Sequence, residues 1–209
     1  MKVKELFYSL QGEGVLIGTP TVFVRTVGCN LECEWCDTEY AKKGGDEMSV
    51  EQVLKKTEGF GTRFVCLTGG EPLLQEDAIK LIERLVDRCY HVTVETNGSL
   101  PLDDIPCTEN VLISMDIKCP SSGMQDRMMY GNIELLSPAD QLKFIVADHK
   151  DLLYLENVID EHEPRCNVII TPVGGLDLRP VADFVLKKRM NARVLPQLHK
   201  LIWGDSMGV

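Results

Sequence analysis

The sequence predicts an α/β fold, an open and partial (β/α) barrel with about six parallel strands and reduced crossover helices. Short apolar, β-branched runs alternate with helical patterns along the chain, and this order favours right-handed crossovers and a largely parallel sheet. The 209 residues are too few for a closed eight-fold barrel, which needs about 250. Because no repeat, linker or low-complexity tract divides the chain, we expect residues 1–209 to form a single domain.

The expected strands are short apolar segments bounded by turn residues. They lie at residues 21–27, 63–68, 91–96, 111–117, 141–146 and 167–171, with a last piece near 193–197. Four helical patterns fill gaps between them, at residues 49–58, 76–88, 151–162 and 180–189. The first of these opens on Ser49 and Gln52, whose spacing is that of a capping box.

Two segments lack these patterns. Residues 116–139 are rich in Ser, Gly, Met and Pro, so we expect one crossover helix to be missing or reduced. Residues 6–14 end in Gln-Gly-Glu-Gly, which predicts a turn-rich segment beside the mouth of the barrel.

Charge and hydropathy argue against two classes of partner. A formal net charge of −10 without any basic run argues against a nucleic-acid-binding surface, since phosphate contacts need clustered Lys and Arg. No apolar run approaches the roughly 18 residues of a membrane span, and the first residues are too short an apolar stretch for a signal peptide. We therefore expect a cytoplasmic protein whose eight cysteines are reduced thiols.

Three cysteines, Cys29, Cys33 and Cys36, form a C-x3-C-x2-C loop directly after the strand at 21–27. A closed zinc site or a fully ligated four-iron cluster wants four protein ligands, so three thiolates leave one metal position open for a substrate or cofactor. The other five cysteines are isolated and are predicted to be packing residues. They are Cys66, Cys89, Cys107, Cys119 and Cys166.

Glycines and polar residues follow the next strands in the same way. Thr-Gly-Gly-Glu-Pro at 68–72 succeeds the second strand, Glu-Thr-Asn-Gly at 95–98 succeeds the third, and Asp116 with Lys118 ends the fourth. The carboxyl ends of parallel strands meet at one rim, where α/β sheets bind ligands. The sequence therefore predicts a functional site at this rim, beside the cysteine loop.

These motifs resemble those of the radical S-adenosylmethionine (SAM) superfamily, which has the same cysteine spacing and a Gly-Gly-Glu-Pro segment after the next strand. Within it, the chain is similar to the 7-carboxy-7-deazaguanine synthase family. This narrower resemblance covers nearly the whole chain: Tyr-Ser-Leu-Gln-Gly-Glu-Gly at 8–14, Trp-Cys-Asp-Thr at 35–38, Glu-Thr-Asn-Gly-Ser at 95–99, Gln-Leu-Lys at 141–143 and Gln-Leu-His-Lys at 197–200. The predicted barrel is accordingly one of the radical SAM type.

The resemblance implies a radical SAM carbon–nitrogen lyase. The three cysteines would ligate a [4Fe–4S] cluster whose fourth iron takes SAM, and one electron would cleave SAM to methionine and a 5′-deoxyadenosyl radical. That radical would abstract hydrogen from 6-carboxy-5,6,7,8-tetrahydropterin, and ring contraction with loss of ammonia would give 7-carboxy-7-deazaguanine. The product belongs to 7-deazapurine biosynthesis, as in the queuosine and archaeosine pathways, and the sequence does not say which pathway it feeds.

The resemblance also implies roles for residues of the matched motifs. The pterin would be bound by Leu10, Gln11, Gly12, Glu13, Arg25 and Thr68. SAM would contact Trp35, Cys36, Asp37, Gly70, Glu95, Ser114, Lys118 and Thr171. Gln197 and His199 lie in a matched segment without an assigned role.

Three of these residues also have plain structural alternatives. Thr38 would bind a Mg2+ ion that also meets substrate oxygens, but on local chemistry alone its hydroxyl would close a turn. Arg25 would pair with the substrate carboxylate, or form a salt bridge between elements. Glu95 would face the SAM ribose, or cap the turn that follows its strand.

The family resemblance further implies an electron donor such as flavodoxin or ferredoxin, and a homodimer. Residues 121–136 receive no role beyond a subunit contact or the docking of a reductant. In some of the family the terminal carboxylate reaches the active site. Here the chain continues through residues 201–209, so that contact is absent or passes to a residue such as Asp205.

Two rival hypotheses remain open. An activating protein that makes a glycyl radical on a partner enzyme uses the same cysteine spacing, although Thr38 and the segment at 8–14 suit a Mg2+-bound pterin better. A non-catalytic zinc-binding domain would need a fourth ligand from elsewhere, such as Cys66 or His91.

Overall fold

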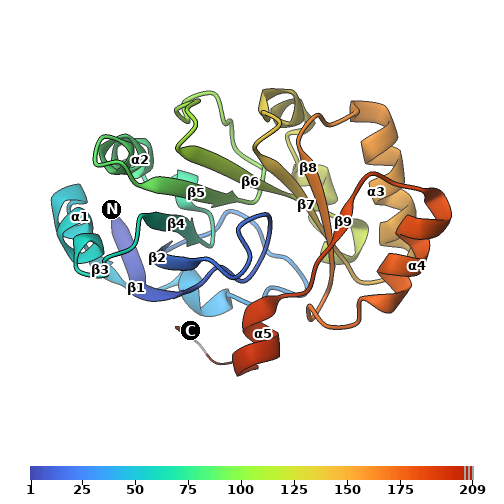
Figure 1. The fold of residues 1–209 in the computed structure, drawn as a ribbon, viewed down its shortest axis with the longest axis horizontal. Helices are drawn as coiled ribbons and strands as arrows, with labels where there is room; N and C mark the ends of the chain where they lie inside the picture. The colour runs from blue at the N-terminus through green and yellow to red at the C-terminus, as the bar shows by residue number, and fades with distance from the viewer. Residues whose placement is uncertain (205, 207, 209) are drawn as a thin grey trace.

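A computed structural model describes residues 1–204, 206 and 208, and its strands form one sheet in the order β3-β1-β2-β4-β5-β6-β7-β8-β9 (Figure 1). The strands are β1 Lys2–Leu10, β2 Pro20–Thr26, β3 Asp46–Glu47, β4 Phe64–Gly69, β5 His91–Thr96, β6 Val111–Lys118, β7 Gln141–Val146, β8 Asn167–Pro172 and β9 Arg193–Val194. From β2 to β9 every neighbouring pair is parallel, whereas β1 is antiparallel to both β2 and β3. The described sheet ends on β3 and β9 without closing, which confirms the open, partial barrel.

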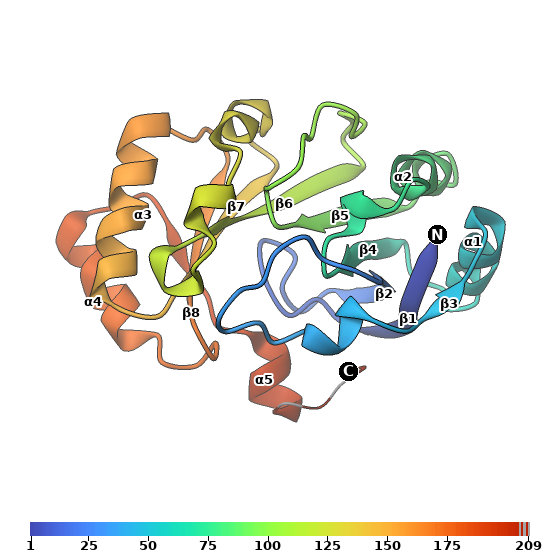
Figure 2. The ribbon, with the colours of Figure 1, turned by 180° about the vertical axis from the view of Figure 1, so that it is seen from behind.

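Four of the helices lie along the outer side of the curved sheet, and the fifth lies at its open side (Figures 1 and 2). The outer helices are α1 Val50–Glu58, α2 Ala78–Val86, α3 His149–His162 and α4 Arg179–Lys188, and the fifth is α5 Leu198–Trp203. The outer helices agree with the expected ranges to within two residues. The capping box of α1 is also confirmed, with the Ser49 amide donating to Gln52 Oε1 at 2.8 Å and the Gln52 amide to Ser49 Oγ at 3.3 Å.

The core lies between these helices and the sheet. On α2, Leu81, Ile82 and Leu85 are fully buried, and each such side chain contributes about 1.5–3 kcal/mol relative to an exposed one. Their partners include Leu67 on β4 and Val94 on β5, both fully buried as well. Apolar burial on the outer face of the sheet thus leaves its carboxyl edge free to carry polar residues.

The segment after β6 confirms the expected loss of a crossover helix. Between β6 and β7 the chain makes three short 3-10 turns, Pro120–Ser122, Gln125–Arg127 and Tyr130–Leu135, in place of an α-helix. Figure 2 shows the first part of this segment in front of the sheet.

Two expectations for the ends of the chain were wrong. Residues 6–10 belong to the nine-residue strand β1, and only residues 11–19 form the irregular segment. Most β1 side chains are half-exposed, so the strand lacks the apolar alternation that would have indicated it. The extended piece expected at 193–197 is only the two-residue β9, and the helix α5 that follows was not expected.

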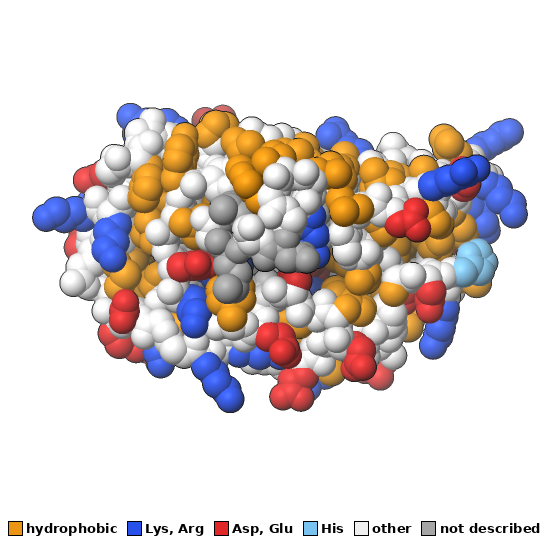
Figure 3. Space-filling model, turned by 90° about the horizontal axis from the view of Figure 1, so that it is seen from below, with side chains coloured by type: hydrophobic (Ala, Val, Ile, Leu, Met, Phe, Trp, Pro, Cys, Tyr) orange, Lys and Arg blue, Asp and Glu red, His pale blue; other side chains and the backbone are white. Residues whose placement is uncertain are grey.

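The described surface shows no single dominant patch of charge on the face in Figure 3, where basic and acidic side chains are interspersed with apolar ones. Among the described residues no helix is both long enough and apolar enough to cross a membrane. All eight cysteines are free thiols. The expectation that the isolated cysteines pack inside holds for Cys66 and Cys119 but is wrong for Cys89 and Cys107, which are exposed.

Candidate active site

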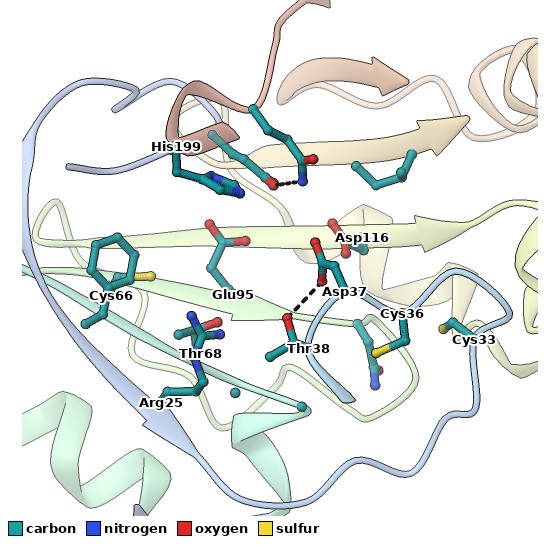
Figure 4. Close-up of a pocket in the computed structure, with 18 of the residues that line it drawn as sticks. Arg25, Cys33, Cys36, Asp37, Thr38, Cys66, Thr68, Glu95, Asp116 and His199 are labelled. Carbon is teal, nitrogen blue, oxygen red and sulfur yellow. Dashed lines mark hydrogen bonds between the residues drawn. The ribbon is translucent and has the colours of Figure 1, made fainter. Parts of the chain in front are cut away.

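A cavity of about 480 Å³ opens at the carboxyl ends of the parallel strands (Figure 4). Arg25 reaches it from β2, Thr68 from β4, Glu95 from β5, and Asp116 and Lys118 from β6. The sequence therefore placed the site at the correct rim. The predicted residues that line the cavity are Leu10, Gln11, Gly12, Glu13, Arg25, Cys29, Cys33, Trp35, Cys36, Asp37, Thr38, Thr68, Gly70, Glu95 and Lys118.

Ser114 and Thr171, two of the predicted SAM contacts, are buried and lie outside the cavity lining. The hydroxyl of Ser114 instead donates to Glu95 Oε2 at 2.8 Å and accepts from Gln141 Nε2 at 2.6 Å. After β8 the cavity is lined by Val173 and Gly174. Ser114 thus holds Glu95 by a hydrogen bond but does not itself line the cavity.

The cysteine loop is held against the loop after β4 by close backbone packing. A Cβ atom at Gly70 would lie 2.3 Å from the carbonyl oxygen of Gly28 and 2.6 Å from Cys29 Cβ. The amide of Glu71 donates to that same Gly28 oxygen at 2.8 Å. Position 70 therefore needs glycine because any side chain there would push the two loops apart.

Glu71 joins this pair of loops to a third one. Its fully buried carboxylate accepts hydrogen bonds from Thr96 Oγ1 at 3.0 Å, the Asn97 amide at 2.7 Å and the Leu73 amide at 3.0 Å. Burial raises the pKa of Glu71, and the hydrogen bonds to its carboxylate oppose that rise. The Gly-Gly-Glu-Pro motif contains Glu71, but its sequence gives no sign that this carboxylate joins the loops after β4 and β5.

Polar side chains surround the three cysteines on two sides. Asn97 donates from Nδ2 to Cys29 Sγ at 3.8 Å and to Asn30 Oδ1 at 3.0 Å. On the other side, Trp35 Nε1 donates to Ser121 Oγ at 2.9 Å, so the first 3-10 turn after β6 fixes the indole beside the loop. This contact gives the unassigned segment at 121–136 a role in supporting the cysteine loop.

The chemistry of the donors fits an iron–sulfur cluster. Cys29, Cys33 and Cys36 are half-buried free thiols that line one cavity. Burial raises the pKa of the Cys33 thiol, and the ammonium of Lys118 opposes this by favouring the thiolate. Among the described residues, no three His, Cys, Asp or Glu side chains converge on a single metal ion. Cysteines that each ligate a different iron of a cluster need no such convergence.

Asp37 and Thr38 follow the third cysteine and turn their oxygens into the cavity. Figure 4 shows both side chains between Cys36 and the carboxylates of Glu95 and Asp116. Thr38 donates from Oγ1 to Asp37 Oδ1 at 2.8 Å, so the local hydrogen bond considered for this hydroxyl is present. A hydroxyl and a carboxylate beside a cavity are also oxygen ligands that suit a hard cation such as Mg2+.

Arg25 lies on the opposite wall of the cavity, where it forms a salt bridge and also lines the cavity. Its Nε donates to Glu5 Oε1 at 2.7 Å, and its guanidinium lies 5.7 Å from the Phe7 ring centroid and 5.8 Å from that of Tyr40. The salt bridge therefore exists. The same side chain lines the cavity, so the bridge fixes the position of a guanidinium there.

The segment after β1 forms the wall nearest α5. Leu198 donates its amide to the Gly12 carbonyl at 2.9 Å, and a Cβ at Gly12 would lie 2.3 Å from His199 Nδ1. Gln197 donates from Nε2 to Glu13 Oε1 at 2.6 Å. Gln197 and His199 thus line the cavity because α5 packs on the Gln-Gly-Glu segment. Asp205 lies outside the described residues.

Four charged side chains meet on the floor of the cavity. The buried Lys143 places its Nζ 2.9 Å from Glu13 Oε2, 2.7 Å from Glu95 Oε2 and 3.3 Å from Asp116 Oδ1. We call these four residues the Lys143 cluster. Lys118 adds a second ammonium, 2.8 Å from Asp116 Oδ2.

The pKa values of the three carboxylates in the Lys143 cluster shift in different directions. Burial by itself would raise the pKa of Glu13, but the ammonium of Lys143 and the hydrogen bond from Gln197 hold it below its ordinary value. Burial likewise opposes ionisation of Asp116, and Lys118 and Lys143 together lower its pKa. For Glu95, the effect of burial is larger than the opposing effect of the Lys143 ammonium, so its pKa is raised. Lys143 has no role among the sequence-based predictions, although a lysine within an apolar strand is a signal of a buried charge with partners.

The comparisons with known proteins agree on one family. Residues 23–134 match the radical SAM superfamily. A 7-carboxy-7-deazaguanine synthase of Methanospirillum hungatei is 43% identical over 206 residues, which cover 97% of this chain and 85% of the relative. Another, of Thermoplasma acidophilum, is 38% identical over the full length of both chains. This chain belongs to the 7-carboxy-7-deazaguanine synthase family.

Family membership confirms the resemblance drawn from the motifs. The crystal structure of QueE from Escherichia coli superposes with a TM-score of 0.74 over 93% of each chain at 22% identity, which confirms the fold. As a radical SAM family, it uses a [4Fe–4S] cluster and SAM, and Cys29, Cys33 and Cys36 are the matching cysteines. Membership also sets aside the glycyl-radical activating protein and the zinc-binding domain.

The structure adds a physical objection to the zinc hypothesis. His91 is the first residue of β5, at the opposite end of the parallel strands from the cysteine loop. Its ring packs edge-on against Phe64, with the ring centroids 5.5 Å apart. It cannot complete a site formed by the cysteines.

Proposed function

We propose that this chain converts 6-carboxy-5,6,7,8-tetrahydropterin to 7-carboxy-7-deazaguanine with loss of ammonia, as a radical SAM lyase. The observation that supports this best is the composition of one cavity. It contains the three cysteines of the loop, two oxygen donors next to them, and a guanidinium facing a set of carboxylates. These are the groups that a cluster, a hard cation and an anionic pterin require.

On the cofactor side, Cys29, Cys33 and Cys36 would hold the cluster. There a cluster with bound SAM would supply the electron and the 5′-deoxyadenosyl radical needed for hydrogen abstraction. The chain supplies position: the proposed SAM contacts line the cavity around the cysteine loop, where close packing at Gly70 brings backbone next to Cys29. They are Trp35, Cys36, Asp37, Gly70 and Lys118. Glu95, which the resemblance assigned to SAM, is bound by Lys143 and would contact the pterin instead.

On the substrate side, Arg25 would bind the pterin carboxylate, since its guanidinium is already oriented by Glu5. Glu13 and Gln11 would accept hydrogen bonds from N–H groups of the ring edge. Thr38 would take Mg2+ together with oxygens of the substrate. This places the anionic end of the pterin toward Arg25 and its N–H donors toward the Lys143 cluster.

The proposal extends to a cytoplasmic, single-domain homodimer that takes electrons from a flavodoxin or ferredoxin. The free thiols support a reducing compartment, and the single continuous sheet supports one domain. Light scattering of the purified protein tests the dimer. Turnover with each reduced donor in place of a chemical reductant tests the electron source.

The central experiment is anaerobic reconstitution of the cluster, followed by incubation with SAM, a reductant, Mg2+ and the pterin. We expect 5′-deoxyadenosine and 7-carboxy-7-deazaguanine to form together. An intact cluster that yields neither product would overturn the proposal.

A further inference from the structure

The Lys143 cluster joins chain segments that are far apart in sequence. Lys143 lies within β7, Glu95 near the end of β5, Asp116 on β6, and Glu13 in the segment after β1. All four line the cavity, and the Lys143 ammonium is within 3.3 Å of an oxygen of each carboxylate. Its contacts therefore lie where a ligand would be bound, rather than deep in the apolar core.

Hydrogen bonds from neighbouring residues fix the orientation of two of these carboxylates. Glu13 receives Lys143 on Oε2 and Gln197 on Oε1, so both of its oxygens are held. Glu95 receives Lys143 and Ser114 on the same oxygen, Oε2. In the described part of the chain Oε1 of Glu95 accepts no hydrogen bond, so it remains available to a ligand in the cavity.

A lysine buried only for stability would be a poor choice at this place. Desolvating an ammonium costs several kcal/mol, and apolar residues of similar volume often stabilise a core as well or better. Here the cost is offset by three carboxylates that would otherwise repel each other in one small volume. The arrangement is favourable when those carboxylates are needed as ligands.

We infer that Lys143 is a positioning residue for the pterin: its ammonium holds Glu13 and Glu95 in the orientation that binds the N–H edge of the ring. This inference rests on the proposed function. It assigns a role in substrate binding to Lys143, which belongs to the matched Gln-Leu-Lys segment but received no role from the resemblance. It also predicts that SAM binding, which depends on residues around the cysteine loop, does not depend on Lys143.

The test measures two dissociation constants on cluster-loaded protein without reductant, so that no turnover occurs. In Lys143→Met the dissociation constant of the pterin should rise at least about tenfold, as expected for lost charge-assisted hydrogen bonds, while that of SAM stays within about twofold. In turnover assays KM should rise far more than kcat falls. Lys143→Arg, which keeps the charge, should recover part of the binding.

A double variant tests whether Lys143 and Glu13 act together on pterin binding, which would not be expected if Lys143 only stabilised the fold. If Lys143 acts through Glu13 as well as through Glu95, the loss of pterin binding in the double variant Lys143→Met/Glu13→Gln should be smaller than the sum of the two single losses. Lys188→Met is the matched control, because Lys188 forms an ion pair with Glu156 outside the cavity lining. It should leave both dissociation constants unchanged.

Three outcomes would overturn the inference: unchanged pterin binding in Lys143→Met, an equal loss of SAM binding, or additive effects in the double variant. If Lys143→Met does not fold, Lys143→Gln, which keeps a hydrogen-bond donor without charge, carries the same test. Failure of the wild-type protein to bind the pterin would instead contradict the proposed function.

Discussion

The two edges of the parallel sheet use polar residues for opposite purposes, and β5 shows both. Its first residue, His91, packs edge-on against Phe64, and its Nε2 atom is buried without a hydrogen-bond partner among the described residues. Near its other end, Glu95 receives two hydrogen bonds and lines the cavity. Glu95, whose carboxylate lines the cavity, lies only four positions after His91, whose ring packs in the fold.

A second pair of residues on β7 repeats the contrast. Asp140, just before the strand, is buried and accepts the Ile113 amide on Oδ1 and the Ser137 amide on Oδ2, both at 2.7 Å. Lys143, three residues later, binds side chains that line the cavity. Asp140 at the amino edge accepts hydrogen bonds from backbone amides, whereas Lys143 and Glu95 bind other side chains. Changes at the amino edge should therefore cost stability, and changes at the carboxyl edge should cost turnover.

The largest effect should follow from removing a cluster ligand. Alanine at Cys29, Cys33 or Cys36 should abolish turnover, because each thiolate would hold a different iron. Iron and sulfide analysis with an activity assay measures this. A variant of this set that retains full iron content and activity would contradict the ligand assignment.

Thr38→Ala should have the next largest effect, and it should leave the cluster intact. Loss of one oxygen ligand should weaken Mg2+ binding and lower turnover about tenfold or more, with the loss partly recovered at high Mg2+ concentration. Titration of activity with Mg2+ checks it, with the cluster's visible absorption as the internal control. Unchanged Mg2+ dependence would show that Thr38 serves only the turn.

At the opposite edge, Asp140→Ala should lower the free energy of unfolding by about 1–3 kcal/mol, because a buried amide and a partly buried amide lose their acceptor. Activity per folded molecule should remain near that of the wild type. Chemical denaturation paired with the activity assay measures both. A large loss of specific activity in a folded Asp140→Ala protein would break the division between the edges.

The smallest effect concerns pH and His91. Burial holds the pKa of His91 below its ordinary 6.5, so the unfolded chain takes up a proton there before the folded protein does. Stability should consequently fall as the pH drops from about 6.5 through the folded pKa, by on the order of 1 kcal/mol or less. His91→Gln should reduce that slope and leave stability at pH 8 little changed. An identical slope in the variant would assign the pH dependence to other groups.

Contiguous motifs identified the residues that line the cavity beside the cysteine loop. The cysteine loop, Thr38 and Gly70 are spaced along short segments whose chemistry is local, and the strands that position them are apolar and regular. The position of the rim followed from the direction of those strands, since parallel strands end at one edge. These conclusions needed no knowledge of distant contacts.

Long-range contacts explain what the sequence did not predict. The role of Lys143 depends on three carboxylates from other segments, and that of Ser114 on its burial behind Glu95. Strand β1 escaped prediction because its side chains are half-exposed and their spacing is not alternating. The helix α5 is only six residues long and is held by contacts with Gly12, so its own sequence carries little signal.

The contact between α5 and the segment after β1 has a consequence for biogenesis. Glu13 and Gln197 are 184 residues apart in sequence, whereas the segments that surround the cysteines lie between residues 28 and 122. During synthesis, the loops around the cysteines can therefore assemble while the last segment is still in the ribosome. The pterin wall closes only when the two ends of the chain meet, which is the slowest kind of contact to form.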